Sequence, residues 1–405
     1  MSIQFIEGGV CAPAGFLAAG VHCGIRKNKG KRDLALIAAD RECAAAAVYT
    51  KNLVKGAPLA VTKENIADGR ARAVICNSGN ANTCNADGED KARQMCKIAG
   101  DILHIDPKDV IVASTGVIGQ ILPIEPIANA AGALKAALCD NSDGAAEAIL
   151  TTDTMQKQAA VEFRLDGKTC RMGAMAKGSG MIHPNMATML CFVTTDAAVA
   201  PAALQEALQA AVNDTFNMVS VDGDTSTNDM VSVLASGAAG NEEVQPGTEE
   251  AAVFTEALTA LLRRLAKMVA GDGEGATHLM ECVVTGAPSE RVARTVAKSV
   301  ICSSLTKAAI FGADANWGRV LCAIGYAGVD VDVTRVDVAF RSAKGEIPVC
   351  KNGAGIPFDE DTAKKILLER EVTIAVELNS GQNSATAWGC DLTYDYVKIN
   401  GDYRT

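Results

Sequence analysis

Residues 177–190, KGSGMIHPNMATML, form the stretch that decides how this chain is built. Gly178, Gly180 and Pro184 mark its first part as a turn-forming loop, and an apolar run that reaches Val193 follows Thr188. Thr188 therefore stands at the first residue of a strand that we predict at 188–194. From that position its hydroxyl can attack the preceding carbonyl and exchange the amide for an ester. Hydrolysis of the ester would cut the chain.

A cut before Thr188 would give this threonine a free α-amine. An N-terminal threonine carries its base beside its nucleophile, and an unperturbed α-amine has a pKa of about 7.7–8.0. Such a residue is suited to acyl transfer. The local pattern by itself also fits the plain start of a strand, because threonine is a good strand former.

The composition indicates an enzyme that acts on small metabolites. The chain has 405 residues, enough for two domains or for one large domain with a satellite. Its net charge of −10 argues against nucleic acid or an anionic membrane as a partner, since both attract basic surfaces.

The cysteines and histidines indicate neither disulfides nor a metal site. The fourteen cysteines are scattered, form no C-x-x-C pair and mostly lie in apolar runs, so we expect buried free thiols in a reducing cytoplasm. The four histidines lie far apart without ligand spacing, so we expect no metal. The apolar stretch 9–25 follows the acidic Glu7 and contains Pro13, which argues against a signal peptide.

Apolar periodicity predicts an α/β fold with mixed sheets, because strands and helices alternate along the chain. We predict strands at 34–39, 71–76, 110–113, 159–165, 188–194, 280–285, 333–340 and 372–378. We predict helices at 127–139, 202–212, 249–270 and 289–302. After Gly286 the long helices become fewer, so we expect a smaller C-terminal domain over 285–405 that ends in an extended segment at 393–397.

Three loops have residue patterns that bear on chemistry. Residues 112–119 (VASTGVIG) leave a strand through glycine and could aim backbone N–H groups at an oxyanion, although an ordinary strand-to-loop junction has the same pattern. Residues 221–229 lack the glycine and glutamate of a calcium loop, so we expect a hydrogen-bonded loop near the active site. Residues 271–275 (GDGEG) lack the ending of a phosphate loop, and the Glu274 carboxylate better suits an ammonium group.

The run 177–190 is similar to the cleavage segment of the glutamate N-acetyltransferase (ornithine acetyltransferase) family of arginine biosynthesis. Segments 8–16 and 314–319 also recur in that family, and the resemblance covers residues 8–405. It implies a layered α/β sandwich with mixed sheets, resembling N-terminal-nucleophile-like folds, and a smaller C-terminal α+β domain. It also implies self-cleavage between Ala187 and Thr188.

The resemblance assigns roles to individual residues. Thr188 is implied as the nucleophile, with Thr115 and Gly116 as the oxyanion hole. Residues implied to contact substrate are Thr154, Lys177, Thr188, Glu274, Asn400 and Thr405.

The same resemblance implies an α chain (1–187) and a β chain (188–405), of which 188–284 completes the catalytic core. Two copies of each would form a heterotetramer. The implied reaction is ping-pong: Thr188 takes acetyl from N-acetylornithine and gives it to glutamate, without a cofactor. Some members of that family also accept acetyl-CoA, which makes them bifunctional, and the motifs leave that donor open.

Two other functions remain open at this point. A self-cleaving aminopeptidase or amidase would use the same chemistry with water as the acceptor. An uncleaved binding protein would use none of it.

Overall fold

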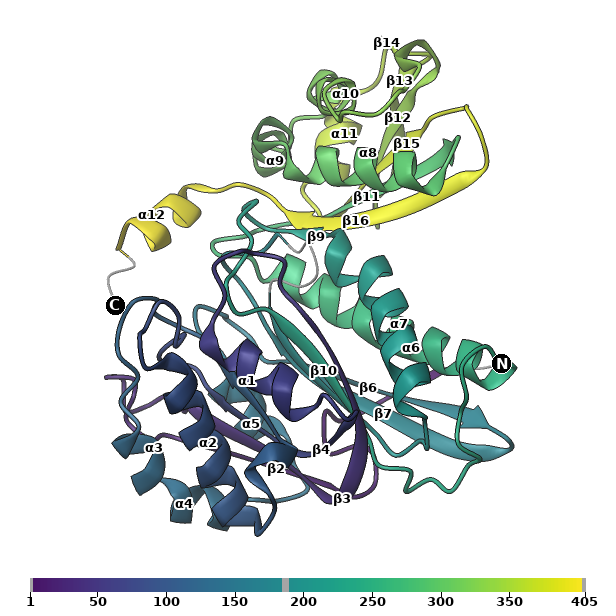
Figure 1. The fold of residues 1–405 in the computed structure, drawn as a ribbon. Helices are drawn as coiled ribbons and strands as arrows, with labels where there is room; N and C mark the ends of the chain where they lie inside the picture. Colours follow the sequence, from purple (N-terminus) through teal and green to yellow (C-terminus); the bar gives the residue numbers. More distant parts are fainter. Residues whose placement is uncertain (1–2, 184–188, 403–405) are drawn as a thin grey trace. The chain divides into compact units, whose positions relative to one another are not determined.

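The computed structural model describes residues 3–183 and 189–402 of the chain (Figure 1). Its contacts divide the chain into two compact units. The first takes its described residues from Met1–Gly178, Pro184–Asn217 and Thr225–Leu265. The second takes them from Ser179–His183, Met218–Asp224 and Ala266–Thr405.

The first unit contains a nine-stranded mixed sheet, as far as the described residues show. The order is β1-β6-β7-β8-β10-β3-β4-β5, with β2 paired to β3, and the β8–β10 and β4–β5 pairs are parallel. Its strands are β1 (Gln4–Ile6), β2 (Phe16–Val21), β3 (Leu34–Tyr49), β4 (Arg70–Asn77), β5 (Val110–Ser114), β6 (Lys157–Leu165), β7 (Lys168–Lys177), β8 (Leu190–Thr195) and β10 (Met230–Ala235).

Alternate residues of β3 are buried in two different cores, as the two-residue period of a strand requires. Leu34 and Leu36 belong to the core that includes Met95 of α2, whereas Ala35 and Ile37 belong to the core that includes Ala145 of α5. Figure 1 shows α1 and α2 near one another, and α6 packs against β3. The helices of the first unit are α1 (Ala57–Asn65), α2 (Gly88–Leu103), α3 (Glu125–Asn129), α4 (Ala131–Ala136), α5 (Asp143–Ala148) and α6 (Pro201–Asp214), with the 3-10 turn η1 (Pro107–Asp109). The 3-10 turn η2 (Phe216–Met218) and helix α7 (Glu249–Gly271) begin in the first unit and end in the second.

The second unit contains a seven-stranded mixed sheet within the part of the chain that is described. The order is β14-β13-β12-β15-β11-β16-β9, and β11 pairs in parallel with β15 and antiparallel with β16. Its strands are β9 (Val219–Ser220), β11 (Leu279–Ala287), β12 (Asp337–Ser342), β13 (Gly345–Lys351), β14 (Ala354–Gly355), β15 (Glu371–Glu377) and β16 (Asn383–Cys390).

Helix α8 (Glu290–Cys302) covers this second sheet, packing on β11 and β16. Ser289 caps its N-terminus by accepting from the Val292 N–H, and Val292, Val296 and Val300 lie four residues apart on its buried face. The remaining elements are α9 (Ser304–Phe311), α10 (Trp317–Gly325), η3 (Val333–Arg335), α11 (Glu360–Leu367) and α12 (Tyr394–Asp402).

The prediction of an α/β fold with mixed sheets is confirmed, and several predicted elements need correction. The helix predicted at 127–139 is two short helices that meet at Ala130. The strand predicted at 333–340 begins only at Asp337, because Asp332 caps a 3-10 turn by accepting from the Thr334 N–H. Of the strand predicted at 188–194, the described part begins as β8 at Leu190.

The segment predicted as extended at 393–397 is mostly helical. From Tyr394 on it belongs to α12, whose first turn contains Asp395, an acidic residue favoured at a helix N-terminus. The Asn400 side chain donates to the Tyr396 carbonyl (3.0 Å), a contact between residues four apart on a helix. The prediction of an extended segment was therefore wrong for these residues, which local hydrogen bonding holds in a helix.

The fourteen cysteines, all within the described residues, are free thiols. Most are buried or partly buried, as predicted, but Cys84, Cys139 and Cys322 are exposed. Each helix in the described part of the chain is too short or too polar to span a lipid bilayer.

Candidate active site

The predicted oxyanion segment forms a tight turn directly after β5. The Thr115 N–H donates to the Asn77 carbonyl (2.9 Å), which leaves its hydroxyl as the group able to act on a substrate. Gly116 has φ +126°, and a Cβ there would lie 2.7 Å from the Gly79 carbonyl carbon. Among the hydrogen bonds of residues 3–183 and 189–402, the Gly116 N–H has no acceptor. Two donors of different kinds are thus available side by side.

Two asparagines hold this turn, and sequence reasoning missed both. Asn77 donates to the Ser114 hydroxyl (2.7 Å) and accepts from the Asn80 N–H (3.1 Å). Asn228 donates to the carbonyls of Ala81 (2.6 Å) and Ser114 (3.0 Å). Asn228 belongs to the loop 221–229, which we predicted to be a hydrogen-bonded loop near the active site. That prediction was the one feature of the sequence that pointed to Asn228.

Lys177 ends β7 and lies beside the oxyanion turn. Its Nζ is 3.4 Å from the Thr115 hydroxyl, and only 8% of the residue is exposed. The structure therefore brings together two of the predicted site residues that are 62 residues apart in sequence. The sheet thus positions this lysine in a largely buried place.

Lys177 belongs to a buried cluster of charged groups. Asp153 pairs with Lys157 (2.7 Å), with both side chains fully buried, and accepts from the Gly178 N–H (2.6 Å). Burial by itself would raise the pKa of Asp153, but the charges of Lys177 and Lys157 outweigh it and hold that pKa well below its ordinary range. Burial lowers the pKa of Lys177, and the charges of Asp153 and Asp229 oppose the change.

Asp229 precedes β10 and completes the cluster. Burial raises its pKa well above the ordinary value, and its Oδ2 has no hydrogen-bond partner in the described part of the chain. The cluster thus combines two buried lysines, Lys157 and Lys177, with the carboxyl groups of Asp153 and Asp229.

The segment around the predicted nucleophile leads into the same region. Leu190, the first residue of β8, pairs with Lys177 of β7 and with Met230 of β10. Ala187 and Thr188 lie outside the described residues. Thr154, another predicted substrate contact, is exposed and follows Asp153 directly.

The second unit brings together two further predicted residues. Glu274 is 7% exposed, and its carboxylate accepts from the Asn400 side chain of α12 (2.7 Å). Its N–H donates to the Ser179 carbonyl (3.1 Å). A Cβ on Gly180 would lie 2.4 Å from the Glu274 carboxylate, so an alanine there would displace that group. Thr405 lies outside the described residues.

The site residues thus form two groups, with Thr115 and Lys177 in the first unit and Glu274 and Asn400 in the second. Within the described ranges, no three His, Cys, Asp or Glu side chains converge as metal ligands would.

Comparison with known proteins places the chain in a family. The sequence pattern of the ArgJ family matches residues 17–405. The chain belongs to the ArgJ family. Its relatives in that family include the arginine biosynthesis bifunctional protein ArgJ of Symbiobacterium thermophilum, which is 53% identical over the full length of both chains. The protein of the same name from Caldanaerobacter subterraneus subsp. tengcongensis is 49% identical, again over the full length of both.

A solved ArgJ structure also resembles the chain. The arginine biosynthesis bifunctional protein from Bacillus halodurans is 50% identical, with a TM-score of 0.51. The match covers 53% of this chain and 100% of that one. The family predicted from residues 177–190 is confirmed, and the chain is an enzyme of that family.

Proposed function

We propose that the chain is a glutamate N-acetyltransferase that moves acetyl from N-acetylornithine to glutamate through an acetyl-Thr188 intermediate. We propose that it also acetylates glutamate from acetyl-CoA. The observation that carries the proposal is the contact between Lys177 and Thr115, in a chain of the ArgJ family. Beside this contact is the Gly116 N–H, which has no acceptor among the described residues. The relatives' name, bifunctional protein ArgJ, supports two activities.

The proposal includes self-cleavage between Ala187 and Thr188. The two products would have 187 residues and 405 − 187 = 218 residues, and the longer is about 54% of the chain. The solved Bacillus halodurans chain corresponds in full to 53% of this chain. A solved chain of that relative length supports a mature protein made of two fragments.

The first half of the proposed reaction transfers acetyl to the enzyme. The Thr188 hydroxyl attacks the acetyl carbonyl of N-acetylornithine, and the Thr188 α-amine takes the hydroxyl proton. Collapse of the tetrahedral intermediate breaks the C–N bond, and the α-ammonium returns the proton to the departing ornithine amine. In the second half the glutamate amine attacks the acetyl ester, and the same steps run in reverse order.

Negative charge develops on the acetyl oxygen in both halves. The Gly116 N–H and the Thr115 hydroxyl are the two donors that we assign to it. Lys177 donates to the Thr115 oxygen, which leaves the Thr115 hydroxyl proton free to point at the substrate. The backbone N–H of Thr115 is already used by Asn77, so the hydroxyl is the donor that this residue contributes.

The remaining predicted residues bind the substrates in this proposal. Lys177 attracts a substrate carboxylate, and Glu274 attracts the side-chain ammonium of the ornithine group. Asn400 positions the Glu274 carboxylate by donating to it. Thr154 and Thr405 are kept as further substrate contacts.

The proposed assembly is a heterotetramer of two 1–187 chains and two 188–405 chains in the cytoplasm, with 285–405 as the smaller domain. Free thiols in every cysteine position are consistent with a reducing compartment.

Incubation with N-acetylornithine, with and without glutamate, tests the reaction. We expect ornithine to accumulate catalytically only when glutamate is present, apart from one equivalent per active site. Equal release without glutamate would identify a hydrolase, since water would then be the acceptor. A single uncut band on a denaturing gel, with no release at all, would indicate a binding protein.

Glu274→Gln should raise the KM for N-acetylornithine by about 10- to 100-fold, since a hydrogen bond to a charged group contributes about 1.5–3 kcal/mol. Glutamine keeps the volume and can still accept from Asn400. The KM for glutamate, which has no side-chain ammonium, should change less than the KM for N-acetylornithine. Steady-state kinetics with each substrate varied in turn measures both.

Glu371→Gln, at an exposed position of β15, is the matched control and should alter neither KM. Equal increases for both substrates in Glu274→Gln would contradict a role in recognising the ammonium.

A further inference from the structure

The chain has a strongly basic loop that the proposed reaction does not use. Residues 26–32 (RKNKGKR), called the basic loop below, contain five cationic side chains in a chain of net charge −10. Lys27, Lys29, Lys31 and Arg32 are exposed. Arg32 lies 3.5 Å from Glu147, whereas the three lysines form no ion pair within the described residues. The lysines therefore present uncompensated positive charge.

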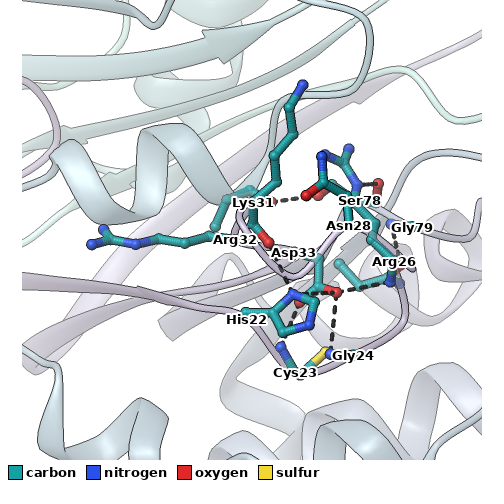
Figure 2. Close-up of polar contacts among 12 residues, drawn as sticks. His22, Cys23, Gly24, Arg26, Asn28, Lys31, Arg32, Asp33, Ser78 and Gly79 are labelled. Atoms are coloured by element: carbon teal, nitrogen blue, oxygen red, sulfur yellow. Dashed lines mark hydrogen bonds and ion pairs between the residues drawn. The ribbon is translucent and has the colours of Figure 1, made fainter.

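The buried Asp33 side chain fixes the base of the basic loop. Its carboxylate accepts from the backbone N–H groups of Cys23 (2.6 Å), Gly24 (3.2 Å) and Arg26 (2.9 Å). Figure 2 shows these bonds converging on Asp33, with the Lys31 side chain pointing away from it. A loop held by three bonds to one carboxylate loses little further entropy when it binds a ligand.

The tip of the loop is also folded. The Lys31 N–H donates to the Asn28 carbonyl (3.2 Å), and the Gly30 N–H donates to the Asn28 side chain (3.0 Å). The His22 ring lies 2.9 Å from the Lys31 carbonyl. The lysines thus project from a turn with defined hydrogen bonds.

Arg26 ties the basic loop to the oxyanion turn. Its Nε donates to the Ser78 carbonyl (2.8 Å), and its guanidinium also donates to the Leu150 carbonyl. Gly79, which follows Ser78, has the carbonyl carbon that would lie 2.7 Å from a Cβ on Gly116. Leu150 leads into the segment that contains Asp153 and Thr154. The loop is therefore attached to both chain segments that flank the first group of site residues.

We propose that the basic loop binds the phosphate groups of the acetyl-CoA donor. The inference rests on the acetyl-CoA activity proposed above. Coenzyme A carries a 5′-diphosphate and a 3′-phosphate, joined to its thioester by a long flexible arm. Its phosphates can therefore rest on a surface loop while the acetyl group reaches the site. Lysine ammonium groups recognise phosphate as point charges.

The charge distribution favours this ligand over nucleic acid. A nucleic acid needs an extended basic face, and its many phosphates would meet the repulsion of a chain with net charge −10. A single loop with three exposed lysines matches the few phosphates of one coenzyme molecule. N-acetylornithine has no phosphate, so the loop should matter much less for this donor than for acetyl-CoA.

The triple variant Lys27→Glu/Lys29→Glu/Lys31→Glu tests the proposal. The KM for acetyl-CoA should rise by about 10-fold or more, because three attractive contacts become repulsive. The rate of acetyl transfer from N-acetylornithine to glutamate should stay within about twofold of the unchanged protein, which also reports that the variant is folded. The triple variant Lys351→Glu/Lys364→Glu/Lys365→Glu, exposed in the second unit, makes the same charge change and should leave both donors unaffected.

Acetyl-3′-dephospho-CoA is the second probe. The unchanged protein should use it less well than acetyl-CoA, and the basic-loop variant should treat the two donors more alike. An unchanged KM for acetyl-CoA in the basic-loop variant would overturn the inference and leave the proposed function in place. Failure of the unchanged protein to use acetyl-CoA would overturn the acetyl-CoA activity and this inference together, whereas transfer from N-acetylornithine would stand separately.

Discussion

A Thr188→Ala variant should run as one intact chain on a denaturing gel and should transfer no measurable acetyl group. One hydroxyl serves both reactions in the proposal, since it attacks the Ala187 carbonyl during cleavage and the acetyl carbonyl during catalysis. Loss of a catalytic nucleophile in a characterised protease lowers kcat by on the order of 10⁶-fold. Mass spectrometry of the purified protein and an ornithine-release assay measure the two effects.

Thr188→Ser is the control for this variant, because it keeps a hydroxyl at the same position. It should still be cut, and terminal sequencing should find residue 188 at the start of the 218-residue fragment. Cleavage of the alanine variant at this bond would show that the nucleophile lies elsewhere.

Gly116→Ala should lower kcat by about 10²- to 10³-fold, the usual effect of losing one oxyanion donor. The added Cβ would lie 2.7 Å from the Gly79 carbonyl carbon and 2.8 Å from the Asn80 nitrogen, both backbone atoms. The turn must therefore move, and the Gly116 N–H moves with it. The KM values should change much less than kcat, because the lost bond is strongest in the transition state.

Gly119→Ala, three residues further along, is the control variant. It distinguishes the effect of a steric clash with the added Cβ from the effect of backbone strain at a positive φ. Gly119 also has a positive φ (+80°), but a Cβ there would meet nothing within 4 Å. Its variant should lose some stability through backbone strain and keep most of its kcat. Equal losses of kcat in the two variants would mean that strain, and not displacement of the Gly116 N–H, causes the effect.

The sequence predicted the fold class well because the spacing of apolar residues distinguishes strands from long helices. The helix predicted at 249–270 is α7 at Glu249–Gly271, with nearly the same limits. The prediction from sequence failed where tertiary contacts decide the limits of an element. Strand β3 continues through the polar stretch at Asp40, Arg41 and Glu42, because a bulge between Ala38 and Cys43 lets three exposed charged residues remain within the strand.

The candidate site was predictable only in part. Thr115 and Lys177 were identified by family resemblance, and their contact required the structure. Asn77, Lys157 and Asp229 were missed because a buried polar residue within an apolar stretch gives no local signal of its partner. Only the folded chain reveals that Lys157 neutralises Asp153, or that one oxygen of Asp229 has no partner among the described residues.

The sheet order of the first unit has a thermodynamic consequence if the chain is cut before Thr188. Strands β8 and β10, which follow the cut, lie between β7 and β3, which precede it. The two fragments would then share one hydrogen-bonded sheet and could separate only by unfolding. Denaturation would become a dissociation, so its midpoint would depend on protein concentration. The matured protein would also refold by a bimolecular encounter, slower at dilution than folding of the parent chain. Cleavage would thus convert a protein that folds as a single chain into one whose lifetime depends on a slow rate of unfolding.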